Sequence, residues 1–159
     1  MMRVEVIAVG KLKERFLTDG CSEYLKRLSA YGRVGVTEIK EERCPDDPSP
    51  AEVERVLLRE GERILAKIAP RDFVVPLCIE GKQMDSVAFA HTLEKAAQGG
   101  GRLVFVIGGS FGLSPAVKAR GDVLFSFGKI TLPHQLARMV LLEQVYRAFQ
   151  ILNGGKYHK

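Results

Sequence analysis

The architecture of this chain follows from one segment, Arg102-Leu103-Val104-Phe105-Val106-Ile107-Gly108-Gly109-Ser110-Phe111-Gly112-Leu113. Residues 103–107 are all apolar, which predicts a strand buried on both faces. The three glycines that follow predict a tight turn, and residues 114–119 predict a short helix. A strand with two buried faces requires helices on both sides, so the segment predicts the inner part of a parallel sheet.

The same alternation of strand and helix extends in both directions from this segment. Further strands are predicted at residues 3–9, 34–39, 72–79 and 122–125, and the strand at 72–79 is expected to be buried on both faces. Further helices are predicted at 13–28, 50–68, 86–97 and 135–152, with Ser49 as the cap of the second. We expect an α/β fold, a mostly parallel sheet flanked by helices, in a single domain over residues 1–159.

Composition excludes several classes of protein. The chain is 46% hydrophobic and 27% charged, as in soluble globular proteins. It has no apolar run near the ~20 residues of a membrane span and no secretory signal, so we expect a cytoplasmic protein without a membrane partner. Its three cysteines and three histidines share no ligand spacing, so neither a disulfide framework nor a metal site is expected.

The net charge of +5 is concentrated at one end of the chain. Residues 1–109 carry 17 basic and 17 acidic side chains, whereas residues 110–159 carry seven basic and two acidic ones. A basic region of this kind can bind a phosphate backbone, although scattered cations on a solvated surface would give the same count.

Three loops follow predicted strands or precede the last helix, at residues 80–84, 108–113 and 126–134. Ligands of open α/β sheets bind beyond the carboxyl ends of the strands, where such loops gather. Adjacent glycines at 108 and 109 permit close approach to the backbone, although a plain tight turn would also use them. His134 is equally consistent with a packing or capping residue.

The last residues combine an aromatic ring, an imidazole and two cations. Tyr157 and His158 stand between Lys156 and Lys159. A frayed terminus is the ordinary expectation for such a segment. The combination nevertheless suits stacking on a base and pairing with phosphate.

Together these segments resemble the RlmH family, small SPOUT-class methyltransferases that modify a pseudouridine of large-subunit ribosomal RNA. The resemblance runs from end to end of the chain. Its residues are Val4-Glu5-Val6-Ile7-Ala8-Val9-Gly10-Lys11-Leu12-Lys13, Ile79-Glu80-Gly81-Lys82, Phe105–Leu113, Thr131-Leu132-Pro133-His134-Gln135-Leu136-Ala137-Arg138, Glu143-Gln144-Val145-Tyr146-Arg147-Ala148 and Tyr157-His158-Lys159.

The resemblance implies a SPOUT (α/β knot) fold, in which the C-terminal segment forms a trefoil knot. It also implies that the third loop folds back on the glycine loop and forms a cleft for S-adenosylmethionine. By position, the cofactor contacts are Leu77, Gly108, Phe127, Gly128, Lys129, Ile130, Thr131 and Leu132. Relatives commonly have serine at the position of Gly128 and methionine at that of Ile130, which puts the cofactor affinity in question.

The reaction implied is methyl transfer to N3 of a pseudouridine in 23S ribosomal RNA, on the assembled ribosome and without a metal. His158 is the candidate base, Tyr157 is placed to stack on the target, and Arg147 to stabilise negative charge. The resemblance also implies a homodimer with one protomer's cofactor near the other's tail. The expected interface residues are Leu136, Met139, Val140, Leu142, Glu143 and Tyr146.

Three other functions are compatible with parts of the sequence. One is a SPOUT methyltransferase acting on another RNA nucleotide, for example in transfer RNA. A second is a non-catalytic ribosome-associated factor that keeps the same fold. A third, from the strand and helix pattern alone, is a flavodoxin-like nucleotide-binding protein, which the absence of a phosphate motif near the N-terminus disfavours.

Overall fold

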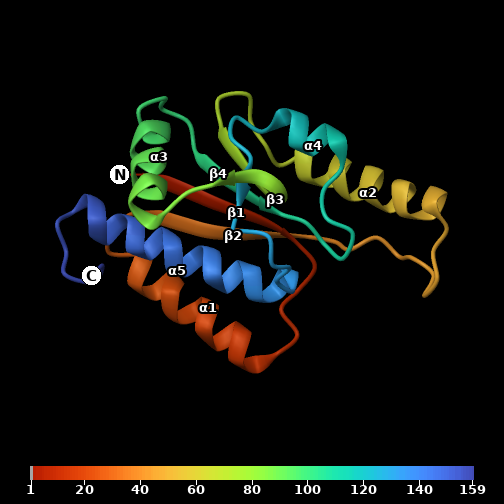
Figure 1. The fold of residues 1–159 in the computed structure, drawn as a ribbon, viewed down its shortest axis with the longest axis horizontal. Helices are drawn as coiled ribbons and strands as arrows, with labels where there is room; N and C mark the ends of the chain where they lie inside the picture. The colour runs from red at the N-terminus through yellow and green to blue at the C-terminus, as the bar shows by residue number, and fades with distance from the viewer. Residues whose placement is uncertain (1) are drawn as a thin grey trace.

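A computed structural model describes residues 2–159, and Figure 1 shows its fold as a parallel sheet between helices. The elements in chain order are β1 (Arg3–Val9), α1 (Arg15–Leu28), β2 (Arg33–Ile39), α2 (Pro50–Leu65), β3 (Phe73–Gln83), α3 (Ser86–Ala97), β4 (Leu103–Ile107), α4 (Pro115–Arg120), β5 (Phe125–Ser126) and α5 (His134–Leu152). The strand order is β2-β1-β4-β3-β5, and every pair is parallel. The predicted α/β class with a mostly parallel sheet is confirmed.

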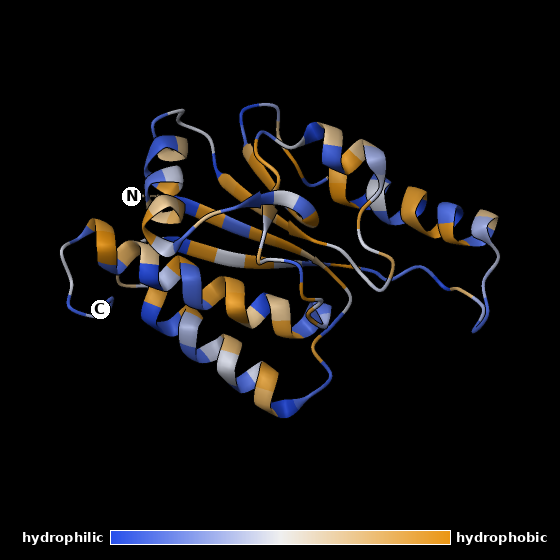
Figure 2. Ribbon diagram, in the orientation of Figure 1, coloured by the Kyte–Doolittle hydropathy of each residue, from blue (hydrophilic) through white to orange (hydrophobic). Residues whose placement is uncertain are grey.

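Helices cover both faces of the sheet. α1, α3 and α5 lie on one face, and α2 and α4 lie on the other (Figure 1). Alternate side chains of each inner strand enter different cores: Val6 and Phe105 pack toward α5, while Ile7 and Val106 pack toward α2. All five residues of β4 are buried between these two layers, as predicted. Figure 2 shows apolar and polar residues alternating along the helices that cover the sheet.

Capping residues fix where three of the helices begin. The Ser49 hydroxyl accepts a hydrogen bond from the backbone N–H of Glu52, whose carboxylate accepts one from the N–H of Ser49. Asp85 caps α3 and Ser114 caps α4 through the same kind of side-chain bond. Each cap contributes about 1 kcal/mol to helix stability, and the predicted start of α2 at Ser49-Pro50 is confirmed.

The predicted loop at 80–84 is wrong, because β3 continues to Gln83. A Cβ on Gly81 would stand 2.6 Å from the backbone of Phe125, so only glycine lets β5 approach this part of β3. The outer half of β3 also lacks the expected burial on both faces, since Ile79 is 58% exposed.

The last strand is shorter and later than predicted, at Phe125–Ser126 instead of 122–125. Asp122 instead bonds to the start of β3: its backbone N–H donates to the carbonyl of Val74, and its carboxylate accepts from the N–H of Val74. The polar Asp122 therefore satisfies the unpaired backbone of an edge and leaves pairing to Phe125.

The long helix α5 is anchored at the carboxyl ends of β1 and β2. The Arg138 side chain is buried, and its Nη1 and Nη2 atoms donate to the Glu38 carboxylate at 2.8 Å and the Gly10 carbonyl at 3.1 Å. Leu142, which sequence reasoning assigned to an interface, is fully buried in the core beneath α5. This residue faces its own protomer because the helix packs between α1 and α3.

Among the helices of residues 2–159, none is both long and apolar enough to cross a membrane.

Candidate active site

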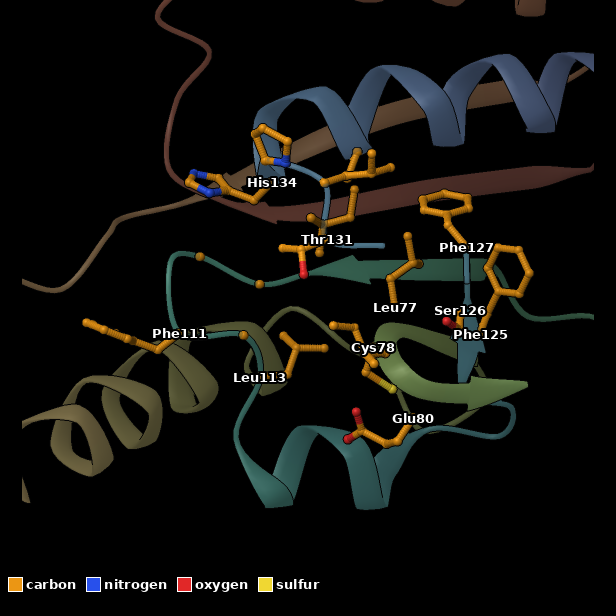
Figure 3. Close-up of a pocket in the computed structure, with 18 of the residues that line it drawn as sticks. Leu77, Cys78, Glu80, Phe111, Leu113, Phe125, Ser126, Phe127, Thr131 and His134 are labelled. Atoms are coloured by element: carbon orange, nitrogen blue, oxygen red, sulfur yellow. The ribbon is translucent and has the colours of Figure 1, made fainter. Parts of the chain in front are cut away.

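A cavity of about 670 Å³ lies beyond the carboxyl end of β4 and beside the middle of β3, against the start of α5. Three segments form it: the middle of β3, the glycine loop after β4, and the segment that joins β5 to α5. Figure 3 shows Leu77 and Cys78 entering from β3, Leu113 from the glycine loop, and Thr131 from the segment before α5. This is the edge of a parallel sheet where ligands bind.

Glycines give the cavity its backbone walls. A Cβ on Gly108 would stand 2.3 Å from the carbonyl oxygen of Gly112, so the loop closes on itself only with glycine there. Gly112 and Gly128 have φ values of +83° and +120°, which favour glycine, and a Cβ on either would meet no atom within 4 Å. A ligand can therefore approach the main chain of both loops.

The side chains of the cavity are mostly apolar, and its charged groups neutralise each other. Lys118 of α4 bonds to the Glu80 carboxylate, and this bond lowers the pKa of Glu80. Burial, together with the Glu80 charge, raises the pKa of the Cys78 thiol, so Cys78 stays neutral. The free space is lined by leucine side chains, the Thr131 hydroxyl and main-chain groups, which suits an uncharged heterocycle.

Seven of the eight residues predicted to contact a cofactor line this cavity. They are Leu77, Gly108, Phe127, Gly128, Ile130, Thr131 and Leu132. Lys129 is exposed and is not among the lining residues. Sequence reasoning did not assign Cys78 or Leu113 to the cofactor site. Cys78 lies inside a predicted strand and Leu113 ends the glycine turn, and neither gives a further signal. The role of His134 was left open. His134 is the first residue of α5 and lines the cavity.

A second cavity of about 640 Å³ adjoins the first. It shares Phe127, Ile130 and Leu132 with the first cavity and extends between α3 and α5, where Val140 and His158 line it. The C-terminal tail therefore borders the second cavity, and no tail residue lines the first.

The three residues predicted to be catalytic form one cluster at the end of α5. The guanidinium of Arg147 lies over the ring of Tyr157, 4.7 Å from its centroid. Its Nη1 atom is 3.1 Å from Nδ1 of His158. The Tyr157 ring also packs edge-on against Tyr146, with 4.9 Å between centroids. The tail is thus folded against the helix by specific contacts.

Glu143 holds this cluster together, although sequence reasoning placed it at an interface. Its Oε1 atom accepts from Nε and Nη2 of Arg147, at 3.0 and 2.6 Å, and from the Tyr157 hydroxyl at 3.2 Å. Burial and the Glu143 charge raise the pKa of Tyr157, so its phenol keeps the proton that it donates. The spacing of four residues between Glu143 and Arg147 was the signal available in the sequence.

Within one protomer, none of the three residues of the tail cluster lines the first cavity. His134 and Arg147 lie at opposite parts of α5, thirteen residues apart, which is about 20 Å along a helix. Among residues 2–159 the structure holds no group of three or more metal-binding side chains.

Comparison with known proteins identifies the family. A family model described as "Predicted SPOUT methyltransferase" matches residues 2–158. The chain belongs to the SPOUT methyltransferase family. Relatives named "Ribosomal RNA large subunit methyltransferase H" include one from Carboxydothermus hydrogenoformans, 54% identical over 99% of this chain and 100% of its own length. Another, from Streptococcus gordonii, is 50% identical over the same shares, and these matches confirm the RlmH resemblance.

Solved structures agree on the SPOUT methyltransferase fold. A "Probable Methyltransferase" from Bordetella pertussis Tohama I is 16% identical, with a TM-score of 0.58 over 93% of this chain and 95% of that one. A probable methylase family protein from Haemophilus influenzae Rd KW20 is 11% identical, with a TM-score of 0.52 over 96% of this chain and 67% of that one. These similarities establish the fold alone.

Proposed function

We propose that this SPOUT methyltransferase transfers a methyl group from S-adenosylmethionine to N3 of a pseudouridine in 23S ribosomal RNA, on the assembled ribosome. The observation that carries the proposal is the full-length match, at 54% identity, to a relative named as a large-subunit ribosomal RNA methyltransferase. The glycine loop and the tail cluster give this function a cofactor cleft and a set of groups for the base.

The first cavity fits S-adenosylmethionine by size and chemistry. Its backbone walls offer amide and carbonyl groups for the adenine edge, and its leucines offer apolar contact for the ring. The positive charge of Lys118 is paired with Glu80, so it is not left unpaired to repel the positive sulfonium. When bound, S-adenosylmethionine supplies an electrophilic methyl group. In this proposal Leu77, Gly108 and residues 127–132 hold it, with Lys129 at the outer rim.

The tail cluster supplies the groups that act on the RNA. Tyr157 has an aromatic face for stacking on the target nucleotide. Arg147 is a fixed cation that stabilises the negative charge on the base when its N3 proton leaves. His158 is the tail residue that lines the second cavity. In this proposal the second cavity holds the target nucleobase.

The basic end of the chain favours a folded RNA particle as the substrate. Residues 110–159 carry seven basic and two acidic side chains. Arg138 is buried, but Lys129, Lys156 and Lys159 are exposed and can contact phosphate groups. Recognition of shape on the assembled ribosome therefore forms part of the proposal, and the cytoplasm is the corresponding location.

A homodimer completes the proposal. Within one protomer the tail cluster and the first cavity are separated along α5, whereas a second copy would bring its tail to the cavity. Val140 lines the second cavity and Ile130 is 72% exposed at its edge, so apolar surface is available for the partner. Leu136, Met139, Glu143 and Tyr146 are also only partly buried. The trefoil knot of the SPOUT fold, formed by the segment before α5, is part of the same proposal.

Transfer of a labelled methyl group tests the substrate. Labelled S-adenosylmethionine is supplied with ribosomes that lack the modification, with naked ribosomal RNA, or with transfer RNA. We expect label only in the large-subunit RNA of intact ribosomes. Label in transfer RNA would instead support another SPOUT activity, and an absence of label in all three would support a non-catalytic factor.

A further inference from the structure

The Glu143 carboxylate determines which atoms of Arg147 remain available. It takes the Nε and Nη2 donors of the guanidinium, at 3.0 and 2.6 Å. The bond raises the already high pKa of Arg147, so the guanidinium keeps its charge. The remaining Nη1 is the atom that lies 3.1 Å from Nδ1 of His158.

This contact fixes the tautomer of His158. A guanidinium has five N–H donors and no acceptor, so in a hydrogen bond with Arg147 the Nδ1 atom of His158 must accept. A neutral imidazole that accepts at Nδ1 carries its proton on Nε2. Nδ1 is then occupied, and Nε2 offers a hydrogen to whatever lies in the second cavity, which His158 lines.

We propose that Glu143 is a positioning residue that, through Arg147, holds His158 as a hydrogen-bond donor at Nε2 and not as the base of the reaction. The inference rests on the proposed function. It replaces the expectation from the sequence that His158 accepts the N3 proton, because neither ring nitrogen of this tautomer has a free lone pair.

The reaction balances even when His158 does not accept the N3 proton. The N3–H bond of the pseudouridine breaks first, and its proton goes to water in the open second cavity. The resulting negative charge spreads over the neighbouring carbonyl oxygens, where the Nε2 hydrogen of His158 and the charge of Arg147 stabilise it. The N3 electron pair then forms the N–C bond as the S–CH₃ bond breaks, and the thioether leaves without charge.

Glu143, Tyr157 and Asp85, which lie near His158, each make other hydrogen bonds. Glu143 accepts from Arg147 and Tyr157, and the Tyr157 hydroxyl donates to it. Asp85, at the start of α3, lines the same cavity, and its Oδ1 atom accepts from the N–H of Ala88. The donor role of His158 is therefore set by Arg147.

Imidazole nitrogen chemical shifts test the tautomer directly, in the protein without cofactor or RNA. Correlation spectra of the ¹⁵N-labelled protein are recorded above the ordinary histidine pKa of about 6.5, and the His158 signals are assigned by their loss in His158→Gln. We expect an unprotonated Nδ1 and a protonated Nε2. In Glu143→Gln we expect these shifts to move toward a mixture of tautomers, and in Glu94→Gln, an exposed glutamate of α3, to stay unchanged. A protonated Nδ1 in the wild type would overturn the proposal.

Two substitutions at His158 separate a donor from a base in the methylation assay. The Gln amide places an N–H near the position of Nε2 but has no basic nitrogen, whereas Ala provides neither. We expect His158→Gln to keep at least about tenfold more kcat than His158→Ala, and Glu143→Gln to lose about tenfold or more in kcat. Equal kcat for the Gln and Ala variants would overturn the donor role. Binding of S-adenosylmethionine should be unchanged in all three.

The pH dependence of the rate gives an independent readout. If His158 were the general base, kcat/KM would rise with pH and then level off above the pKa of that base. If His158 is a hydrogen-bond donor, kcat/KM of the wild type continues to rise with pH, toward the alkaline ionisation of the N3–H of the pseudouridine. A level profile above that pKa would overturn the proposal. An inactive wild-type enzyme would instead count against the proposed function and leave the tautomer measurement to decide this inference.

Discussion

Gly108 is the residue at which a single added carbon has the clearest predicted effect on the cofactor. A Cβ there would stand 2.3 Å from the Gly112 carbonyl oxygen, so Gly108→Val forces the glycine loop to open. Overpacking of this kind costs about 1–3 kcal/mol. If the loop holds the cofactor, calorimetry should show a loss of roughly tenfold to a hundredfold in affinity for S-adenosylmethionine.

Gly99→Ala is the matched control for this substitution. A Cβ on Gly99 would lie 3.5 Å from the Ala96 carbonyl oxygen, an ordinary contact outside the cavity. Its affinity for S-adenosylmethionine should equal that of the wild type. An unchanged affinity in Gly108→Val would remove the glycine loop from the cofactor site.

At this scale the sequence located most of the site but not the way it is organised. The resemblance to the RlmH family predicted by position that Leu77, Gly108 and Thr131 contact the cofactor. All three line the first cavity. The bonds of Glu143 were not predictable, because an i, i+4 pair on a helix is as often a solvated pair as the anchor of a tail. Which atom of Arg147 faces His158 depends on the fold of the tail.

At the scale of elements, Asp72 joins the end of α2 to the starts of β3 and β4. Its carboxylate accepts from the Ala69 N–H at 2.7 Å and from Nη2 of Arg102 at 2.7 Å. Burial alone would raise the pKa of Asp72, but the bonds from Arg102 and Ala69 outweigh it and lower the pKa. The bonds therefore add stability above the unfolded pKa of about 3.9, and that stability is lost as the pH falls through the lowered folded value.

Removal of this charge should destabilise the fold without acting on the site. Asp72→Asn leaves Arg102 partly buried without its partner, and we expect a loss of about 2–3 kcal/mol in the free energy of unfolding at neutral pH. The loss should shrink in acid, because the wild type then loses the same interaction. Urea unfolding of this variant and of Glu54→Gln, an exposed change on α2, measures both effects. A loss of equal size at acid and neutral pH would contradict the role given to the charge.

The C-terminal tail is the element that separates cofactor binding from methyl transfer. Tyr157 and His158 both contact α5, and His158 also lines the second cavity, but neither residue lines the first cavity. Deletion of residues 157–159 should abolish methyl transfer and leave the calorimetric affinity for S-adenosylmethionine unchanged. Methylation of ribosomes by the truncated protein at the normal rate would show that the tail is not catalytic.

The boundaries of elements were predicted best where local chemistry fixes them. The capping box at Ser49 and the apolar residues of β4 identify their elements without tertiary information. The outer half of β3 was missed because its pairing depends on Gly81 admitting Phe125, a contact between residues far apart in the chain. Leu142 was misplaced because an apolar residue on a helix does not indicate which neighbour it packs against.

At the scale of the whole molecule, the proposed dimer makes a prediction about two impaired variants, assayed at a concentration of S-adenosylmethionine too low to saturate Gly108→Val. If each site combines the cavity of one protomer with the tail of its partner, a heterodimer of Gly108→Val and His158→Ala contains one intact site and one doubly altered site. Isolated heterodimers should then show about half of the wild-type methylation rate. Heterodimers as inactive as either parent would show that cavity and tail act within one chain.

The order of the strands in the sheet and the path of the chain through the knot are properties of the whole molecule. They could not be predicted from the pattern of strands and helices. Alternation of strands and helices predicts a parallel sheet but does not assign β4 to a place between β1 and β3. General rules of chain connection exclude knots, so the proposed knot comes from the family resemblance and not from any property of residues 126–134.

The most direct test of the central claim is the chemical identity of the methylated nucleoside. Ribosomes that lack the modification are incubated with the protein and S-adenosylmethionine, and the digested 23S ribosomal RNA is analysed by mass spectrometry against synthetic standards. The account predicts 3-methylpseudouridine as the new product, absent when residues 157–159 are deleted. A methyl group on a ribose, on another base or on transfer RNA would contradict it.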